Sequence, residues 1–97
     1  MAHILVIPDD GEPTVVPLTE KFTTIGRTPA NHIRVEDGAA SRKHCMIKAM
    51  NQLYTLVDLG SANGTVINGE RLRNREVDLT AGDRIQIGKT VLVFKED

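Results

Sequence analysis

The sequence predicts an all-β domain, a twisted β-sandwich built from many short and mostly antiparallel strands. Short runs rich in branched residues recur along the chain and are separated by turn-forming residues. No window of about 11 residues carries the apolar stripe of an amphipathic helix together with helix start and stop signals. The 4 prolines and 8 glycines interrupt the chain repeatedly outside residues 39–59 and 70–81.

The first part of the chain carries four strand signals. His3–Pro8 and Pro13–Pro17 flank the turn residues 9–11, and Phe22–Gly26 follows a polar stretch. Residues 33–35 alternate between apolar and charged side chains, which is the period of a half-buried strand. We expect each of these runs to form one strand.

The second part of the chain predicts longer strands joined by tight turns. Cys45–Met50 and Leu53–Leu59 are separated by two residues only, which is typical of a hairpin. Further strands are expected at residues 65–67, 70–72, 84–87 and 90–94. Because the loops of a sandwich gather at its two ends, residues far apart in sequence can meet at one end.

Length and composition indicate one globular domain. With 97 residues, of which 40% are hydrophobic, the chain can bury a core, and we expect a single domain over residues 1–97. The formal net charge of −1 argues against general binding to nucleic acid or membranes, which usually needs a basic excess. No apolar run approaches the roughly 20 residues of a membrane-spanning helix.

The cysteine and histidine content excludes several kinds of site. Cys45 is the only cysteine, so neither an intrachain disulfide nor a cysteine-rich zinc site can form, and its apolar neighbours predict a buried thiol. His3, His32 and His44 lack the spacing of metal ligands, and we expect no metal or cofactor. The free thiol and the missing basic leader favour a cytoplasmic, intracellular location.

Four polar clusters between the expected strands carry residues with binding chemistry. They are Gly26-Arg27, the Ser-Arg-Lys-His sequence at 41–44, the Gly-Ser-Ala-Asn-Gly-Thr sequence at 60–65, and Asn68-Gly69. An arginine at a strand end can bind a phosphate through two charge-assisted hydrogen bonds, and a preceding glycine lets the backbone approach closely. Taken alone, Arg27 fits a solvated surface charge as well.

Residues 41–44 offer a hydroxyl and two cations to an anion. Ser41 can donate to a phosphate oxygen while Arg42 and Lys43 add charge; the alternative is a polar loop whose serine caps local amides. A hydrolase would pair Ser41 with His44, but neither an orienting carboxylate nor a nucleophile elbow accompanies them. We therefore expect no enzyme, and interpret His44 as a half-buried residue that bonds loop backbone.

The two Asn-Gly pairs have different interpretations. Asn68-Gly69 is best explained as a plain turn, because both residues tolerate positive φ. The Asn63 amide, in contrast, offers a donor and an acceptor to an extended peptide backbone. Thr65 begins a strand and is expected to pack or bond beneath the loop.

With these clusters in view, residues 22–94 resemble the forkhead-associated (FHA) domain, a phosphothreonine-peptide-binding module. The Gly-Arg pair, the Ser-x-x-His sequence, the Asn-Gly-Thr sequence and the second Asn-Gly pair occur in the order typical of that family. Each motif alone is common, whereas the ordered set is specific. The resemblance implies a twisted FHA/SMAD-like β-sandwich of about eleven strands with its binding loops at one end.

The resemblance also implies a role for each matching residue. Arg27 matches the arginine that grips the phosphate, and Ser41 matches the serine that bonds a phosphate oxygen. Arg42 lies where a further contact is often made, and Asn63 matches the asparagine that holds the peptide main chain. His44 matches a histidine that braces the loops without touching the ligand. The other framework positions are Gly26, Gly64, Thr65, Asn68 and Gly69.

One position departs from the family pattern. Some members carry a threonine or serine just before the asparagine, where this chain has Ala62. Because its side chain has no hydroxyl, one phosphate or threonine contact is lost, and we expect weaker binding than in the strongest members.

The resemblance implies a signal-transduction function, namely phosphorylation-dependent protein–protein interaction. The partner would be a phosphothreonine-containing protein or peptide produced by a Ser/Thr kinase, bound by a monomer. One alternative is a phosphate-independent interaction or self-association scaffold on the same fold. The other alternative is a nucleic-acid-binding domain that uses Arg71, Arg73 and Arg75. These three residues alternate along the chain, and we interpret them as one solvated face. Few aromatic residues are present to stack on bases, which argues against this alternative.

Overall fold

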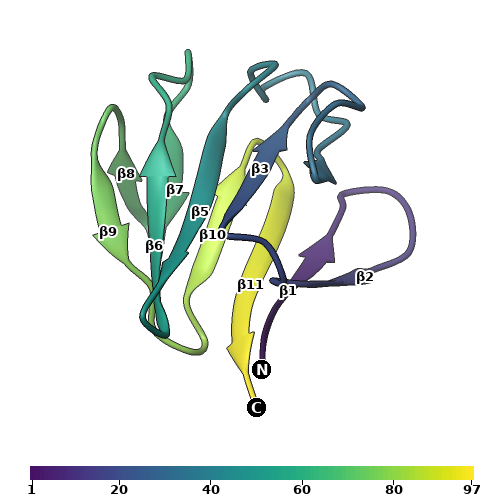
Figure 1. The fold of residues 1–97 in the computed structure, drawn as a ribbon. Helices are drawn as coiled ribbons and strands as arrows, with labels where there is room; N and C mark the ends of the chain where they lie inside the picture. The colour runs from purple at the N-terminus through teal and green to yellow at the C-terminus, as the bar shows by residue number, and fades with distance from the viewer.

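The computed structural model describes residues 1–97 and confirms the predicted all-β sandwich (Figure 1). Eleven strands form two sheets, and no helix in the structure could span a membrane. The strands are β1 (Ala2–Ile7), β2 (Thr14–Pro17), β3 (Phe22–Gly26), β4 (Ile33–Arg34), β5 (Cys45–Met50), β6 (Leu53–Asp58), β7 (Thr65–Ile67), β8 (Glu70–Leu72), β9 (Glu76–Asp78), β10 (Arg84–Ile87) and β11 (Thr90–Glu96).

The two sheets pack face to face, and both chain termini lie at the same end (Figure 1). The six-stranded sheet has the order β2-β1-β11-β10-β7-β8, and the five-stranded sheet has the order β4-β3-β5-β6-β9. Neighbouring strands pair antiparallel, except for the short parallel pair of β3 and β4. This arrangement carries the chain repeatedly between the two ends of the sandwich.

Two-residue turns set the register of two hairpins. Asn51 and Gln52 have φ values of 51° and 66°, and Asn68 and Gly69 have φ values of 49° and 86°. Positive φ at both turn residues matches the right-handed twist of the flanking strands. The predicted hairpins β5–β6 and β7–β8 are therefore confirmed.

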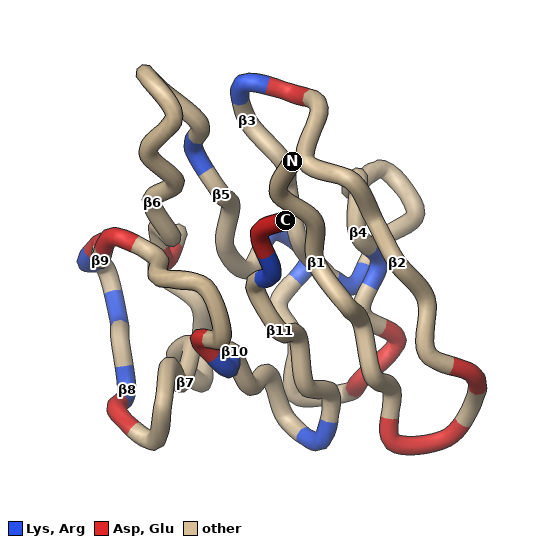
Figure 2. Tube along the Cα trace, turned by 90° about the horizontal axis from the view of Figure 1, so that it is seen from below, with Lys and Arg blue, Asp and Glu red and all other residues tan.

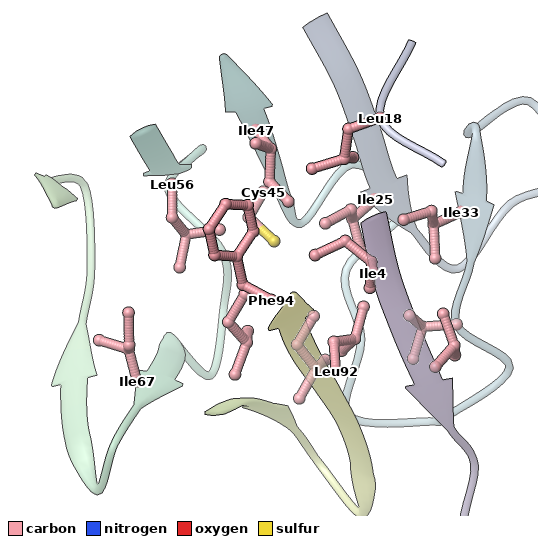
Figure 3. Close-up of a cluster of buried hydrophobic side chains, with 14 of the residues drawn as sticks. Ile4, Leu18, Ile25, Ile33, Cys45, Ile47, Leu56, Ile67, Leu92 and Phe94 are labelled. Atoms are coloured by element: carbon pink, nitrogen blue, oxygen red, sulfur yellow. The ribbon is translucent and has the colours of Figure 1, made fainter. Parts of the chain in front are cut away.

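Alternating burial along the strands builds one core between the sheets. In β1, three residues are fully buried and alternate with three that are partly exposed. Figure 3 shows Ile25 and Ile47 of one sheet facing Ile4, Leu92 and Phe94 of the other. The core holds 17 buried residues, and each large apolar side chain contributes about 1.5–3 kcal/mol on burial.

Burial also determines the chemistry of the single cysteine. Cys45 has 0% exposure, as predicted, and its sulfur points into the core (Figure 3). Burial raises the pKa of this thiol to about 12, because the thiolate would lose its solvation. The thiol is thus protonated at neutral pH and behaves as a small apolar group.

The sequence patterns missed β9 and placed some strand ends wrongly. Val77 is the only apolar residue of β9 and lies between Glu76 and Asp78, so no strand signal stands out. β9 is an edge strand that pairs with β6 alone, and charged residues are common at such edges. The last strand continues past its predicted end at Phe94 to Glu96, because Glu96 still pairs with Ala2.

Candidate functional site

One end of the sandwich gathers four chain segments, which we call the rim. They are residues 26–32 after β3, residues 35–44 before β5, residues 59–64 between β6 and β7, and the turn at residues 88–89. Figure 1 shows the connections after β3, before β5 and after β6 together at the upper end of the molecule. The predicted gathering of these loops at one end is confirmed.

Arg27 directly follows β3, and its side chain is held in place by a hydrogen bond at Nε. Its backbone N–H donates to the carbonyl of Ser41 at 3.0 Å, and its Nε donates to the carbonyl of Ala40 at 3.1 Å. The two terminal amino groups of the guanidinium make no hydrogen bond within the protein, and Arg27 is exposed. A guanidinium fixed in this way can present its fork to an anion.

Gly26 lies where a side chain has no room. A Cβ atom there would collide with the carbonyl oxygen of Arg42 and would lie 2.8 Å from Nδ2 of Asn31. That same Nδ2 donates to the Arg42 carbonyl at 2.8 Å. Gly26 and Asn31 together fix the backbone from which Arg42 projects. The sequence singles out Pro29-Ala30-Asn31 as a candidate specificity loop but does not predict this supporting bond from Asn31 to the Arg42 carbonyl.

Ser41 joins two rim segments through its hydroxyl. Its Oγ accepts a hydrogen bond from the N–H of Ala62 at 3.1 Å. Because that bond uses an oxygen lone pair, the hydroxyl proton remains available for an acceptor outside the protein. Arg42 and Lys43 follow Ser41 in the chain with exposed side chains, and Arg27 bonds the Ser41 carbonyl, so three basic residues lie on the backbone next to Ser41.

His44 lies beneath Ser41 and is fully buried, with 0% exposure, rather than half-buried as the sequence predicted. Its Nδ1 accepts from the N–H of Ser41 at 3.0 Å, and its Nε2 lies 2.9 Å from the carbonyl oxygen of Gly64. An amide N–H only donates and a carbonyl only accepts. The ring is therefore the neutral tautomer with its proton on Nε2. The imidazole connects the two rim segments.

Asp58 ends β6 and organises the 59–64 segment from below, with 3% exposure. Burial raises the pKa of this carboxyl, but five hydrogen bonds outweigh burial and hold the pKa below its ordinary value. The donors are the Gly60 N–H, the Ser61 N–H and hydroxyl, the Thr65 hydroxyl and the Asn74 N–H, at 2.6–3.1 Å. Sequence reasoning missed Asp58, although an aspartate two residues before a glycine is typical of an Asx turn, in which its carboxylate accepts from that N–H.

Asn63 extends from the 59–64 segment towards the segment before β5. Its Nδ2 donates to the carbonyl of Ala39 at 2.9 Å, which leaves Oδ1 and the second amide hydrogen unused. Gly64 follows with φ of 77°, and a Cβ atom there would lie 2.9 Å from Cγ of Arg71. Thr65 is fully buried and bonds Asp58, as expected for a residue beneath the loop.

Asp37 ties the turn between β10 and β11 to the rim. Its carboxylate accepts from the N–H groups of Ala39 and Lys89, both at 2.9 Å. These two backbone hydrogen bonds hold the pKa of Asp37 below its ordinary value. A Cβ atom at Gly88 would collide with the same carboxylate, so the turn can approach only because this residue is glycine.

The Asn68-Gly69 turn lies at the opposite end of the sandwich from the rim (Figure 1). Asn68 donates to Asp83 at 2.9 Å and accepts from the N–H of Arg84 at 3.0 Å. It therefore fixes the β7–β8 hairpin against β10. The structure brings the other predicted site and framework residues together at the rim: Gly26, Arg27, Ser41, Arg42, His44, Asn63, Gly64 and Thr65.

Three arginines follow the sheet edge from β8 to β9, where Figure 2 shows a series of basic segments. Arg71, Arg73 and Arg75 are all exposed, as the sequence predicted. Acidic residues instead fill much of the loop between β1 and β2 (Figure 2). Glu70, Glu76 and Asp78 also lie on β8 and β9, so the edge with the arginines carries both signs of charge.

A family model described as the FHA domain matches residues 23–88. The chain belongs to the forkhead-associated (FHA) domain family. The matched range begins inside β3 and ends at Gly88 in the β10–β11 turn, so it includes three rim segments completely and the first residue of the fourth. The family expected from the ordered motifs is therefore confirmed.

Individual relatives and solved structures match the chain over most of its length. It is 46% identical over 79 residues to the oxoglutarate dehydrogenase inhibitor of Corynebacterium diphtheriae, covering 81% of this chain and 54% of that protein. The chain thus spans about half the length of this relative.

A solved structure from work on phosphothreonine-dependent FHA domain interactions has a TM-score of 0.85 and 30% identity, covering 98% of this chain and 97% of that one. EmbR of Mycobacterium tuberculosis, in complex with a low-affinity phosphopeptide, has a TM-score of 0.83 and 32% identity over 97% of this chain and 24% of its own.

The Asp58 hydrogen bonds predict an acid-sensitive fold. A carboxyl whose pKa is lowered by folding stabilises the native state above its ordinary pKa of about 3.9, and this stability is lost as pH falls through the lower native pKa. We expect Asp58→Asn to lower the free energy of unfolding by about 3 kcal/mol at neutral pH. Below about pH 4, the free energy of unfolding of this variant should decrease less steeply with falling pH than that of the wild type. Urea titrations across pH measure both effects. The exposed Asp10→Asn serves as control, and an Asp58→Asn variant with wild-type stability at neutral pH would contradict the role.

The two bonds of the buried imidazole predict a second stability effect. We expect His44→Ala to lower the free energy of unfolding by about 2–3 kcal/mol, because it leaves a cavity and removes the partners of the Ser41 N–H and the Gly64 carbonyl. Thermal and urea unfolding measure this loss. His32→Ala is the control with a smaller expected loss, since that ring is exposed and its hydrogen bond from the Thr24 N–H can be replaced by water. Equal stabilities of the two variants would show that His44 does not brace the rim.

Proposed function

We propose that this FHA domain is a phosphorylation-dependent protein–protein interaction module that binds phosphothreonine-containing peptides at its rim. The observation that carries the proposal is the pairing of an open Arg27 fork with a Ser41 hydroxyl whose proton is unused. Both groups are anchored by hydrogen bonds to neighbouring loop backbone. The likeness to EmbR, which was solved with a phosphopeptide, supports the same chemistry.

The rim offers contacts to both parts of such a ligand. Phosphothreonine carries about −1.5 to −2 charges near neutral pH and several acceptor oxygens. In our proposal the Arg27 fork binds two oxygens, the Ser41 hydroxyl bonds another, and Arg42 adds a further contact. The free Oδ1 and amide hydrogen of Asn63 hold the peptide main chain beside the phosphothreonine.

The energies of these contacts suit a reversible complex. Each hydrogen bond to a charged group contributes roughly 1.5–3 kcal/mol. Two or three of them, with peptide backbone contacts, account for a micromolar complex of about −8 kcal/mol. Because Gly26, His44, Gly64 and Thr65 hold the loops in place without the ligand, little binding energy is spent on ordering them.

The same geometry supports a binding module rather than a hydrolase. The two ring nitrogens of His44 are used by the Ser41 N–H and the Gly64 carbonyl, so neither can accept the Ser41 hydroxyl proton. Without a base, that hydroxyl is a hydrogen-bond donor and not a nucleophile. The relative's name, an oxoglutarate dehydrogenase inhibitor, supports a regulatory role exerted by binding a protein partner.

Calorimetry with matched peptides tests the proposal. An oriented phosphothreonine peptide library first selects a sequence, which is then titrated with and without its phosphate. We expect the plain peptide to bind at least about tenfold more weakly, because the charge-assisted bonds are lost. We expect Arg27→Ala to abolish binding while the thermal midpoint stays unchanged, since its side chain is exposed.

Arg84→Ala is the matched control, because this exposed arginine lies in β10 next to the Asn68 turn and away from the rim. Its affinity for the phosphopeptide should equal that of the wild type. Equal affinities of the wild type for the two peptides would instead support a phosphate-independent scaffold.

A further inference from the structure

Arg73 donates a hydrogen bond to the rim although it lies outside the four rim segments. It lies in the connection between β8 and β9, and its Nη2 donates to the carbonyl of Ala62 at 3.0 Å. The N–H of the same alanine donates to the Ser41 hydroxyl at 3.1 Å. Ala62 is thus held on one side by the proposed phosphate ligand Ser41 and on the other by Arg73.

The backbone that carries Arg73 is itself fixed beneath the rim. The N–H of Asn74 donates to the Asp58 carboxylate at 2.9 Å, and the Arg75 carbonyl accepts from the N–H of Asp58 at 3.0 Å. The connection therefore cannot shift without breaking the Asp58 hydrogen bonds. Arg71 and Arg75, the neighbouring arginines on this edge, make no side-chain hydrogen bond or ion pair, so the contact singles out Arg73.

The guanidinium of Arg73 also lies close to the proposed phosphate position. Nη2 of Arg73 and Oγ of Ser41 both hydrogen-bond to Ala62, one to its carbonyl and the other to its N–H. One residue spans roughly 3.5 Å, which places the two atoms within about 10 Å of each other. This limit is slightly longer than the Debye length of about 8 Å at physiological ionic strength, so salt screens much of the attraction between Arg73 and a bound dianion, and the hydrogen bond to Ala62 supplies the larger share of the effect.

We propose that Arg73 is a positioning residue of the phosphate site. It holds the Ala62 carbonyl, keeps the Ala62 N–H on Ser41, and places a positive charge beside the backbone of Ala62, whose side chain offers no hydroxyl. The proposal rests on the proposed phosphothreonine binding at the rim. Arg73 acts on the bound phosphate dianion, so it strengthens binding of the phosphorylated peptide and not of the plain peptide.

Titration of Arg73 variants tests this role. We expect Arg73→Ala to weaken binding of the phosphopeptide about fivefold to tenfold, as for the loss of one hydrogen bond to a partly exposed group. Arg73→Lys keeps the positive charge but lacks the planar guanidinium group. We expect this variant to recover only part of the affinity for the phosphopeptide that Arg73→Ala loses. The loss in Arg73→Ala shrinks at high salt, because its electrostatic share is screened.

Amide hydrogen exchange supplies a readout that a general loss of stability would not produce. In Arg73→Ala the amides of residues 61–64 should exchange faster, while those of the core strands and the thermal midpoint stay unchanged. Arg75→Ala is the matched control, since Arg75 is exposed on the same edge. Wild-type affinity in Arg73→Ala, or an equal loss in Arg75→Ala, would overturn the assignment.

Arg27→Ala separates this assignment from the proposed function. If Arg27→Ala abolishes binding and Arg73→Ala has no effect, only the role of Arg73 is wrong. If Arg27→Ala still binds the phosphopeptide with wild-type affinity, phosphothreonine recognition at the rim is wrong, and the role of Arg73 is overturned with it.

Discussion

The buried imidazole of His44 is the interaction on which the rim depends. A buried polar ring must find hydrogen-bond partners or cost several kcal/mol, and this ring finds one partner in each of two separate loops. The distance between the Ser41 and Gly64 backbones is therefore set by the width of one side chain. Because the core holds the ring in place, the positions of Ser41 and Asn63 follow from the packing of the sandwich.

Two carboxylates extend this constraint to the rest of the rim. Asp58, which is buried, and Asp37, which is partly exposed, both accept hydrogen bonds from backbone N–H groups, so their negative charges are used in holding loops. The guanidinium of Arg27 and the hydroxyl of Ser41 face solvent instead. A site that attracts phosphate can thus be supported by acidic residues, provided that backbone amides satisfy them.

The sandwich was predictable from the sequence, and so was the gathering at one end of the loops that carry the proposed ligand residues, because those signals are local. Period-2 patterns mark strands, and short ordered motifs mark Arg27, Ser41 and Asn63. The supporting contacts were not predictable, because their partners are distant in the chain. Asp37 bonds a residue 52 positions away, and His44 bonds one 20 positions away, which is why its complete burial was also missed. The burial of a loop residue depends on which other loops cover it, and only the assembled sandwich shows that.

The central claim is that the rim is already built in the free domain and receives the phosphothreonine there. Amide chemical-shift mapping by NMR during titration with a phosphothreonine peptide tests it most directly. The largest shifts should fall on residues 26–28, 41–43 and 62–64, with the core strands and the Asn68-Gly69 turn unchanged. Largest shifts at the end that carries Asn68-Gly69, or a global change of the spectrum that signals refolding, would contradict the claim.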